Sequence, residues 1–327
     1  MTKIGAKAVK PKKPMPSSWK RFIMTILFLG LAVGLTACGS DEPIQAGVSG
    51  KLKITATIGM IADIAREVGG DHVEVTGLMK AGVDPHLYKA SQGDVKKLEQ
   101  ADLILYNGLH LEGKMVEIFE NMQKTKPTVA VSKNIPESKL RSMDDGTASH
   151  DPHIWFDVKH WMTATETVRD ELVKLDAAHA EDYKKSAETY LGKLKELDAY
   201  AKEQIASIPE GQRVLVTAHD AFGYFGDAYG IKVMGLQGIS TASEPGSKDV
   251  IDLRDYLVKN KIKAVFVESS VPKKSIEAMI EGAKKQGHDI VIGGELFSDA
   301  MGEEGTAEGT YLGMVRHNVD TIVKALK

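Results

Sequence analysis

Residues 178–208, AHAEDYKKSAETYLGKLKELDAYAKEQIASI, decide how the rest of the chain is divided. Apolar side chains recur in this stretch at steps of three or four, which places an apolar stripe along one face of a single helix of roughly 30 residues. The stripe consists of Tyr183, Ala187, Tyr190, Leu194, Leu197, Ala201, Ile205 and Ile208. Pro209 and Gly211 follow it and favour termination there. The pattern alone is that of either an ordinary long domain helix or a connector between two domains.

Short apolar runs alternate with helical patterns on both sides of this helix, as is typical of βα units built around mostly parallel sheets. Before the helix, the predicted strands are residues 52–57, 72–79, 102–106 and 128–131. After it, they are residues 213–217, 232–236, 263–268 and 289–292. The sequence therefore predicts an α/β protein with one unit on each side of the long helix.

The amino terminus has the pattern of an export signal. Residues 1–21 carry positive charges and no acid, and residues 22–35 carry no charge. The uncharged stretch is shorter than the roughly 20 residues that a membrane-spanning helix needs. It is followed by LTACG at residues 35–39, where Cys38 is the only cysteine of the chain. This stretch resembles the lipidation site of bacterial lipoprotein signals.

That resemblance implies that residues 1–37 are a signal peptide and that Cys38 becomes the lipidated first residue; two acyl chains are enough for stable anchoring. Residues 38–50 are polar and contain Gly and Ser, which predicts a flexible tether. The alternative is a simple signal peptide beside an incidental cysteine. Removing the signal changes the formal charge from −3 to −10, because all seven charges in it are positive. An acidic chain argues against a nucleic-acid partner and suits the attraction of cations.

The triplet Asp-Pro-His occurs twice, at residues 84–86 and 151–153. A loop fixed by proline that presents an imidazole beside a carboxylate is a plausible half of a metal site. His219 and Asp299 also follow predicted strands, where open α/β sheets bind ligands. The residue types alone leave a structural reading open, because Asp-Pro starts turns and Asp299 could cap a helix. The spacings match no local zinc motif.

Seven segments resemble the metal-binding lipoproteins of bacterial ABC importers for manganese and zinc. They are GVDPHLYKASQGD, NGLHLEGKM, DPHIWFDV, VTAHDAFGYFG, GLQGIS, FVESSV and GGELFSDAMG, and they extend over essentially the whole mature chain. Within this family the chain is most similar to the manganese-binding lipoproteins of Gram-positive bacteria. The resemblance implies two βα lobes with mostly parallel sheets, residues 51–177 and 209–327, joined by residues 178–208 as one long connecting helix.

The resemblance also implies a metal site in the cleft between the lobes. Its ligands would be His86 and His153 from the first lobe and His219 and Asp299 from the second. The implied protein is a monomer, not an enzyme, that captures a divalent metal and delivers it to an ABC permease. It would be anchored through Cys38 to the outer face of the cell membrane of a bacterium. A metallohydrolase, which needs an open coordination position and a general base, and a surface adhesin are the competing classes.

Mn(II) is the predicted cargo, and Zn(II) is also expected to bind. Three imidazoles and a carboxylate suit zinc, and the usual affinity order places Mn(II) lowest. Residues 142–150 contain one histidine, however, whereas zinc-dedicated members of the family often carry a long His-rich loop there. Other manganese binders of the family have Glu where this chain has His219, which keeps a zinc-uptake protein as the alternative. If Asp299 binds through both oxygens, the site becomes five-coordinate and favours Mn(II).

Glu268 and His110 are candidates to orient a ligating imidazole. Glu268 ends a predicted strand, and His110 follows one on the same side as His86. The alternatives are an ordinary strand-end carboxylate and a histidine packed within its own loop. Because imidazoles must lose protons to bind a cation, we expect weak metal capture below about pH 5.5.

Overall fold

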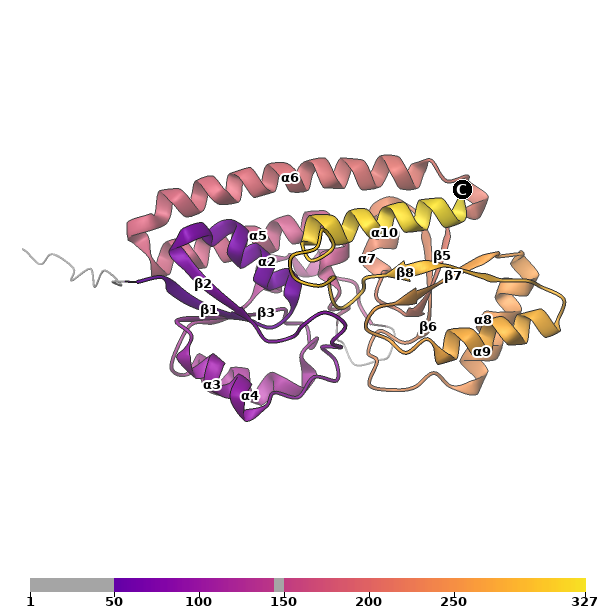
Figure 1. Ribbon diagram of the computed structural model, residues 1–327, viewed down its shortest axis with the longest axis horizontal. Helices are drawn as coiled ribbons and strands as arrows, with labels where there is room; N and C mark the ends of the chain where they lie inside the picture. The colour runs from indigo at the N-terminus through magenta and orange to yellow at the C-terminus, as the bar shows by residue number, and fades with distance from the viewer. Residues whose placement is uncertain (1–49, 144–149) are drawn as a thin grey trace, which may run out of the picture. The chain divides into compact units, whose positions relative to one another are not determined.

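The computed structural model describes residues 50–143 and 150–327, which are drawn in colour in Figure 1. The predicted signal peptide 1–37, Cys38 and all but the last residue of the tether 38–50 lie outside the described residues. The described residues belong to one compact unit, Gly47–Lys327. Within these ranges, no helix is both long enough and apolar enough to cross a membrane.

The first lobe is built on a parallel sheet with the strand order β2-β1-β3-β4. Its strands are β1 Leu52–Ala56, β2 Val73–Gly77, β3 Leu103–Tyr106 and β4 Thr128–Ala130. Figure 1 shows α2 Gly59–Gly69 and α5 Val158–Leu175 on one side of this sheet, and α3 Gln92–Gln100 and α4 Val116–Gln123 on the other. Helices on both faces explain why β1 and β3 are buried almost without interruption.

The second lobe contains two pairs of parallel strands. One pair is β5 Val214–His219 with β6 Lys232–Gln237, and the other is β7 Ala264–Glu268 with β8 Val291–Leu296. The associated helices are α7 Gly223–Tyr229, α8 Ser247–Asn260, α9 Lys274–Lys285 and α10 Tyr311–Leu326. Neighbouring residues of a strand face opposite sides, so Leu215 packs into the core that includes α10 and Val216 into the core under α8 and α9.

The long helix α6, Ala180–Ala206, runs alongside both lobes in Figure 1. Its predicted apolar stripe is buried, and it packs against α2 and α5 of the first lobe and against α7 and α10 of the second. The predicted α/β architecture, with two lobes of parallel sheet joined by one long helix, is therefore confirmed. Each predicted strand is present among the described residues, with ends shifted by a few positions. The shift matters at β5, which extends to His219, whereas that residue was predicted to follow the strand.

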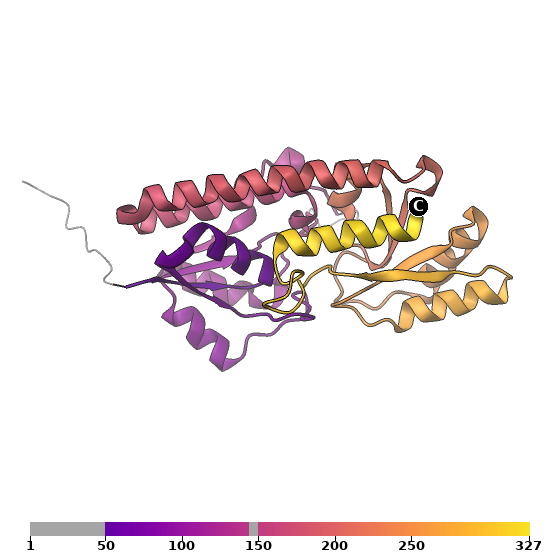
Figure 2. The same cartoon turned by 45° about the horizontal axis from the view of Figure 1, so that its top comes forward.

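Helix α10 is a second connection between the lobes, and Figure 2 shows it lying along α6. Its first residue, Tyr311, is in contact with the first lobe. The Tyr311 backbone N–H donates to Asp63 of α2 over 3.1 Å, and its hydroxyl donates to the carbonyl of Trp155 over 2.7 Å. The indole N–H of Trp155 in turn donates to the carbonyl of Ser298 in the second lobe over 3.0 Å. The lobes are thus tied together on the side of the molecule that carries α6 and α10.

Candidate metal centre

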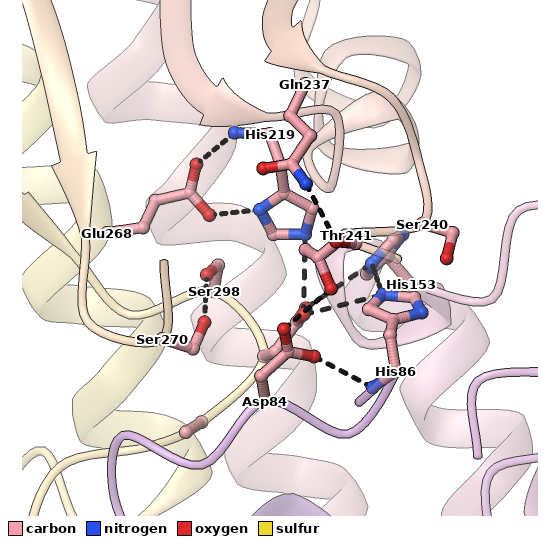
Figure 3. Close-up of polar contacts among 12 residues, drawn as sticks. Asp84, His86, His153, His219, Gln237, Ser240, Thr241, Glu268, Ser270 and Ser298 are labelled. Atoms are coloured by element: carbon pink, nitrogen blue, oxygen red, sulfur yellow. Dashed lines mark hydrogen bonds and ion pairs between the residues drawn. The ribbon is translucent and has the colours of Figure 1, made fainter. Parts of the chain in front are cut away.

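Four buried side chains from distant parts of the chain meet between the lobes. They are His86, His153, His219 and Asp299, and one ligand atom from each lies within 4.8 Å of the others. None of these residues is more than 5% exposed. Figure 3 shows the three imidazole rings converging on one point. The structure therefore brings together all the residues that the sequence suggested as metal ligands.

Three of the four side chains lie at or after the end of a strand, and His153 lies in the segment that leads into α5. His86 lies in the loop after β2, and His153 immediately precedes the short 3-10 turn η5, Ile154–Phe156. His219 is the last residue of β5, and Asp299 follows β8. In parallel sheets these carboxyl ends share one edge, and the two lobes direct their edges at each other.

The distances between the donor atoms suit a single ion. The Nε2 atoms of His86 and His153 are 3.3 Å apart. Asp299 Oδ1 lies 3.3 Å from Nε2 of His153, and its Oδ2 lies 3.5 Å and 3.4 Å from Nε2 of His86 and of His219. Ligands at a metal–nitrogen distance of about 2.1 Å in a tetrahedron are separated by about 3.4 Å, which matches these contacts.

Several of these atoms also lack the hydrogen bonds that burial would require. Among the described residues, Nε2 of His219 and both oxygens of Asp299 have no hydrogen-bond partner. Buried polar atoms are normally satisfied, because an unsatisfied one costs about 1–3 kcal/mol. A cation in the middle of the group would satisfy all three, so the donor set fits a metal.

Buried carboxylates hold two of the imidazoles. Glu268 accepts hydrogen bonds from the backbone N–H of His219 over 2.8 Å and from its Nδ1. Asp151 does the same for His153, over 3.0 Å and 2.7 Å. A carboxylate only accepts, so each Nδ1 carries a hydrogen, and each Nε2 can present a lone pair to the centre once it has lost its own proton. Glu268 thus lies where the sequence suggested, whereas sequence reasoning assigned no such role to Asp151, although it begins the second Asp-Pro-His triplet.

His110 does not lie against the ligands. Its side chain is exposed, and the described hydrogen bonds include none that joins it to the four. Two other residues of the same loop connect to the site instead. The Asn107 amide donates to the carbonyl of Pro152, next to His153, over 2.9 Å. The buried carboxylate of Glu112 accepts from the Asn107 backbone N–H over 2.7 Å and holds this loop in place. A single sequence gives no sign that distinguishes them from other loop residues.

The charges of the site are strongly coupled. Burial lowers the pKa of His86 to about 4. Burial also acts to lower the pKa of His153, but Asp151 and Asp299 outweigh it and raise this pKa to about 9. Against the same effect of burial, Glu268 and Asp299 raise the pKa of His219 well above its usual value. Burial alone would raise the pKa of Asp299, yet His219 and His153 hold it well below its usual range.

The metal-free site thus combines two imidazolium groups with a carboxylate, and an incoming cation displaces protons from the rings. A two-lobed α/β fold with a buried donor set divided between the lobes is that of a metal-binding protein. The family described as zinc-uptake complex component A, periplasmic (ZnuA), matches residues 54–325. The chain belongs to this family, whose members are metal-binding transport components rather than enzymes.

Relatives with different named metals are similar to this chain. It is 53% identical over 304 residues to the manganese-binding lipoprotein MntA of Bacillus subtilis, covering 92% of this chain and 97% of that one. It is 48% identical over 308 residues to the zinc-binding protein TroA of Treponema pallidum, covering 94% of this chain and 98% of that one. The solved structure of TroA superimposes with a TM-score of 0.83 at 50% identity, covering 85% of this chain and 99% of that one. A manganese-bound periplasmic metal-binding protein from Candidatus Liberibacter asiaticus superimposes with a TM-score of 0.74 at 26% identity, covering 85% and 100%.

Proposed function

We propose that this protein captures a divalent metal, preferably Mn(II), outside the cytoplasm and delivers it to the permease of an ABC importer. The observation that carries the proposal is the division of one buried donor set between two lobes. His86 and His153 come from the first lobe and His219 and Asp299 from the second, so the site is complete only while the lobes are together. Relatives named as manganese-binding and zinc-binding proteins support the class of cargo.

The proposed ligands are Nε2 of the three histidines and the carboxylate of Asp299. Glu268 and Asp151 would fix the ring orientations of His219 and His153. Because the ligands are buried, the ion must enter and leave through a displacement of the lobes. Separation of the lobes divides the ligands into two incomplete sets, so delivery needs no covalent chemistry.

The preference for Mn(II) rests on Asp299. Its Oδ1 faces His153 while its Oδ2 faces His86 and His219, and neither oxygen has a hydrogen-bond partner among the described residues. Both oxygens are therefore available to one ion, which would give five donors. Zn(II) prefers four in a closed site, whereas carboxylate-rich, higher coordination suits Mn(II). Zinc uptake is the second candidate, because imidazoles also suit Zn(II) and TroA is named for zinc.

The membrane anchor belongs to the same proposal. Cys38 would carry the lipid and hold a monomeric binding protein on the outer face of the cell membrane of a bacterium. The similarity to MntA of Bacillus subtilis favours a Gram-positive bacterium. Export of a Cys38→Ala variant should release the protein into the medium, and the variant should incorporate no labelled fatty acid. Retention of the variant on the membrane would contradict the anchor while leaving the metal site untouched.

Elemental analysis tests the function directly. The protein is purified from cells supplied with both manganese and zinc, beside His86→Ala and, as a matched control, the exposed His110→Ala. We expect one metal ion per chain in the wild type and in His110→Ala, and none in His86→Ala. A strain without the protein should grow poorly in manganese-limited medium and recover with the wild type but not with His86→Ala. Growth unaffected by the deletion would contradict the transport function.

A further inference from the structure

The loop between β6 and α8 places one buried residue in an otherwise exposed segment. Thr241 is 8% exposed, whereas its neighbours Ser240 and Ala242 are exposed. Its hydroxyl donates to Oδ2 of Asp84 over 2.6 Å. Asp84 belongs to the first lobe and Thr241 to the second, so this hydrogen bond crosses the cleft.

The same carboxylate of Asp84 holds the loop of a proposed metal ligand. Its Oδ1 accepts from the backbone N–H of His86 over 2.8 Å, and Figure 3 shows Asp84 between His86 and Thr241. His153 and His219 each have a buried carboxylate on Nδ1, whereas the described hydrogen bonds of His86 are this one and the contact of its Nε2 with His153. The position of His86 therefore depends on Asp84 more than on any contact of its own ring.

On the second lobe, the loop that carries Thr241 is held by a residue beside His219. Gln237 pairs with His219 in the register of β5 and β6. Its buried side-chain amide donates to the carbonyl of Thr241 over 2.8 Å and to that of Ser243 over 2.7 Å, which fixes the loop. Hydrogen bonds thus connect β6, the strand that pairs with the ligand-bearing β5, to the His86 loop of the first lobe.

We propose that Thr241 is a positioning residue that latches the closed cleft through Asp84 and so prolongs the residence of the bound metal. This inference rests on the metal site proposed above. The Thr241 hydrogen bond exists only while the lobes are together, so it stabilises the closed state relative to the open one. Because the acceptor is a carboxylate, its loss should matter more than that of an ordinary hydrogen bond. Rupture of this contact and withdrawal of His86 form the first step of metal release.

The test measures how fast Mn(II) leaves the loaded protein when excess chelator is added. Tryptophan fluorescence reports the release, since Trp155 lies against His153. Thr241→Val keeps the shape and removes the hydroxyl, Thr241→Ser keeps the hydroxyl, and Ser240→Ala is the matched control in the same loop. We expect Thr241→Val to release Mn(II) about tenfold faster or more, and the other two to stay close to the wild type. The melting temperature of each metal-free variant shows whether it is folded.

Two results would overturn the latch: equal release rates for Thr241→Val and the wild type, or equal acceleration by Val and Ser. Hydrogen exchange on the wild type gives an independent test if Thr241→Val fails to fold. Mn(II) should increase amide protection in residues 83–87 and 238–246 together, and unchanged protection in residues 238–246 would also overturn the latch. A wild type that binds no metal would instead refute the proposed site, which separates the two failures.

Discussion

The carboxylate of Glu268 accepts both hydrogen bonds that His219 directs into the second lobe, one from its backbone N–H and one from Nδ1. This pairing keeps a hydrogen on Nδ1, so that Nε2, which lies 3.4 Å from Asp299, is the nitrogen that loses its proton and offers a lone pair to a metal. Glu268 is at the end of β7 and His219 is at the end of β5, and these two strands lie side by side. The contact between these two strands therefore sets the orientation of a proposed ligand.

Replacement of Glu268 by Gln should weaken metal binding without removing it. Gln retains one acceptor for His219 but loses the charge that makes the imidazole a better donor to a cation. We expect the affinity for Mn(II) to fall about 10- to 100-fold, measured by calorimetric titration. Glu281→Gln, an exposed carboxylate on α9, is the matched control and should bind like the wild type. Equal affinities for all three proteins would contradict the role of Glu268.

Metal binding should release about two protons near pH 7, because His153, with its pKa raised to about 9, and His219 are both protonated in the metal-free site. His86 contributes nothing at this pH, since its pKa is lowered to about 4. Affinity should thus already fall as the pH drops from 8 to 6, above the range expected from ordinary histidines. Calorimetry in buffers of different ionisation enthalpy measures the protons released, and a value near zero would contradict this charge state.

Trp155→Phe should destabilise the joint between the lobes. The substitution leaves the carbonyl of Ser298 without its indole donor and opens a cavity at a fully buried position. We expect the free energy of unfolding to fall by about 2–4 kcal/mol, measured by urea denaturation of the metal-free protein. Tyr200→Phe also removes a hydrogen bond, but one at the surface to Asp320, and should cost under about 1 kcal/mol. Comparable losses for the two variants would count against a special role for Trp155.

Asp63 should make the metal-free protein less stable as the pH rises. Burial is the main cause that raises its pKa to about 6, helped by Glu67 and opposed by the hydrogen bond from Tyr311. A carboxyl whose folded pKa lies above its unfolded value stabilises the fold at low pH, and this contribution is lost between about pH 4 and 6. The loss is about 3 kcal/mol. Asn cannot ionise, so the free energy of unfolding of Asp63→Asn, measured by urea denaturation, should rise relative to that of the wild type as the pH increases over this range. A constant difference between the two proteins at all these pH values would contradict the prediction.

The choice of metal should depend on the pair His219 and Glu268 rather than on His219 alone. His219→Glu by itself would place two buried carboxylates together, and their repulsion should abolish most binding. Adding Glu268→Gln removes that repulsion and leaves a site with more oxygen donors. We expect the double variant to recover Mn(II) binding and to favour Mn(II) over Zn(II) about tenfold more than the wild type does. Competition titrations of the two metals measure the ratio, and an unchanged ratio would mean that this position does not set the preference.

Local patterns were enough to predict the elements of the fold and the turns that carry the histidines. The stripe of α6 and the apolar strands depend on near neighbours in the sequence, and each Asp-Pro-His triplet contains its own turn. The contacts between lobes could not be predicted in this way. Thr241 lies 157 residues from Asp84, and Trp155 lies 143 residues from Ser298. Nothing local marks either pair, because each forms only once both lobes have folded and met.

The most direct test of the metal site is anomalous diffraction from crystals of the Mn(II)-loaded protein, recorded on both sides of the manganese absorption edge. We expect a single strong peak between the lobes, within bonding distance of Nε2 of His86, His153 and His219 and of both carboxylate oxygens of Asp299. A peak elsewhere, or no peak in protein that carries one manganese per chain, would contradict the site.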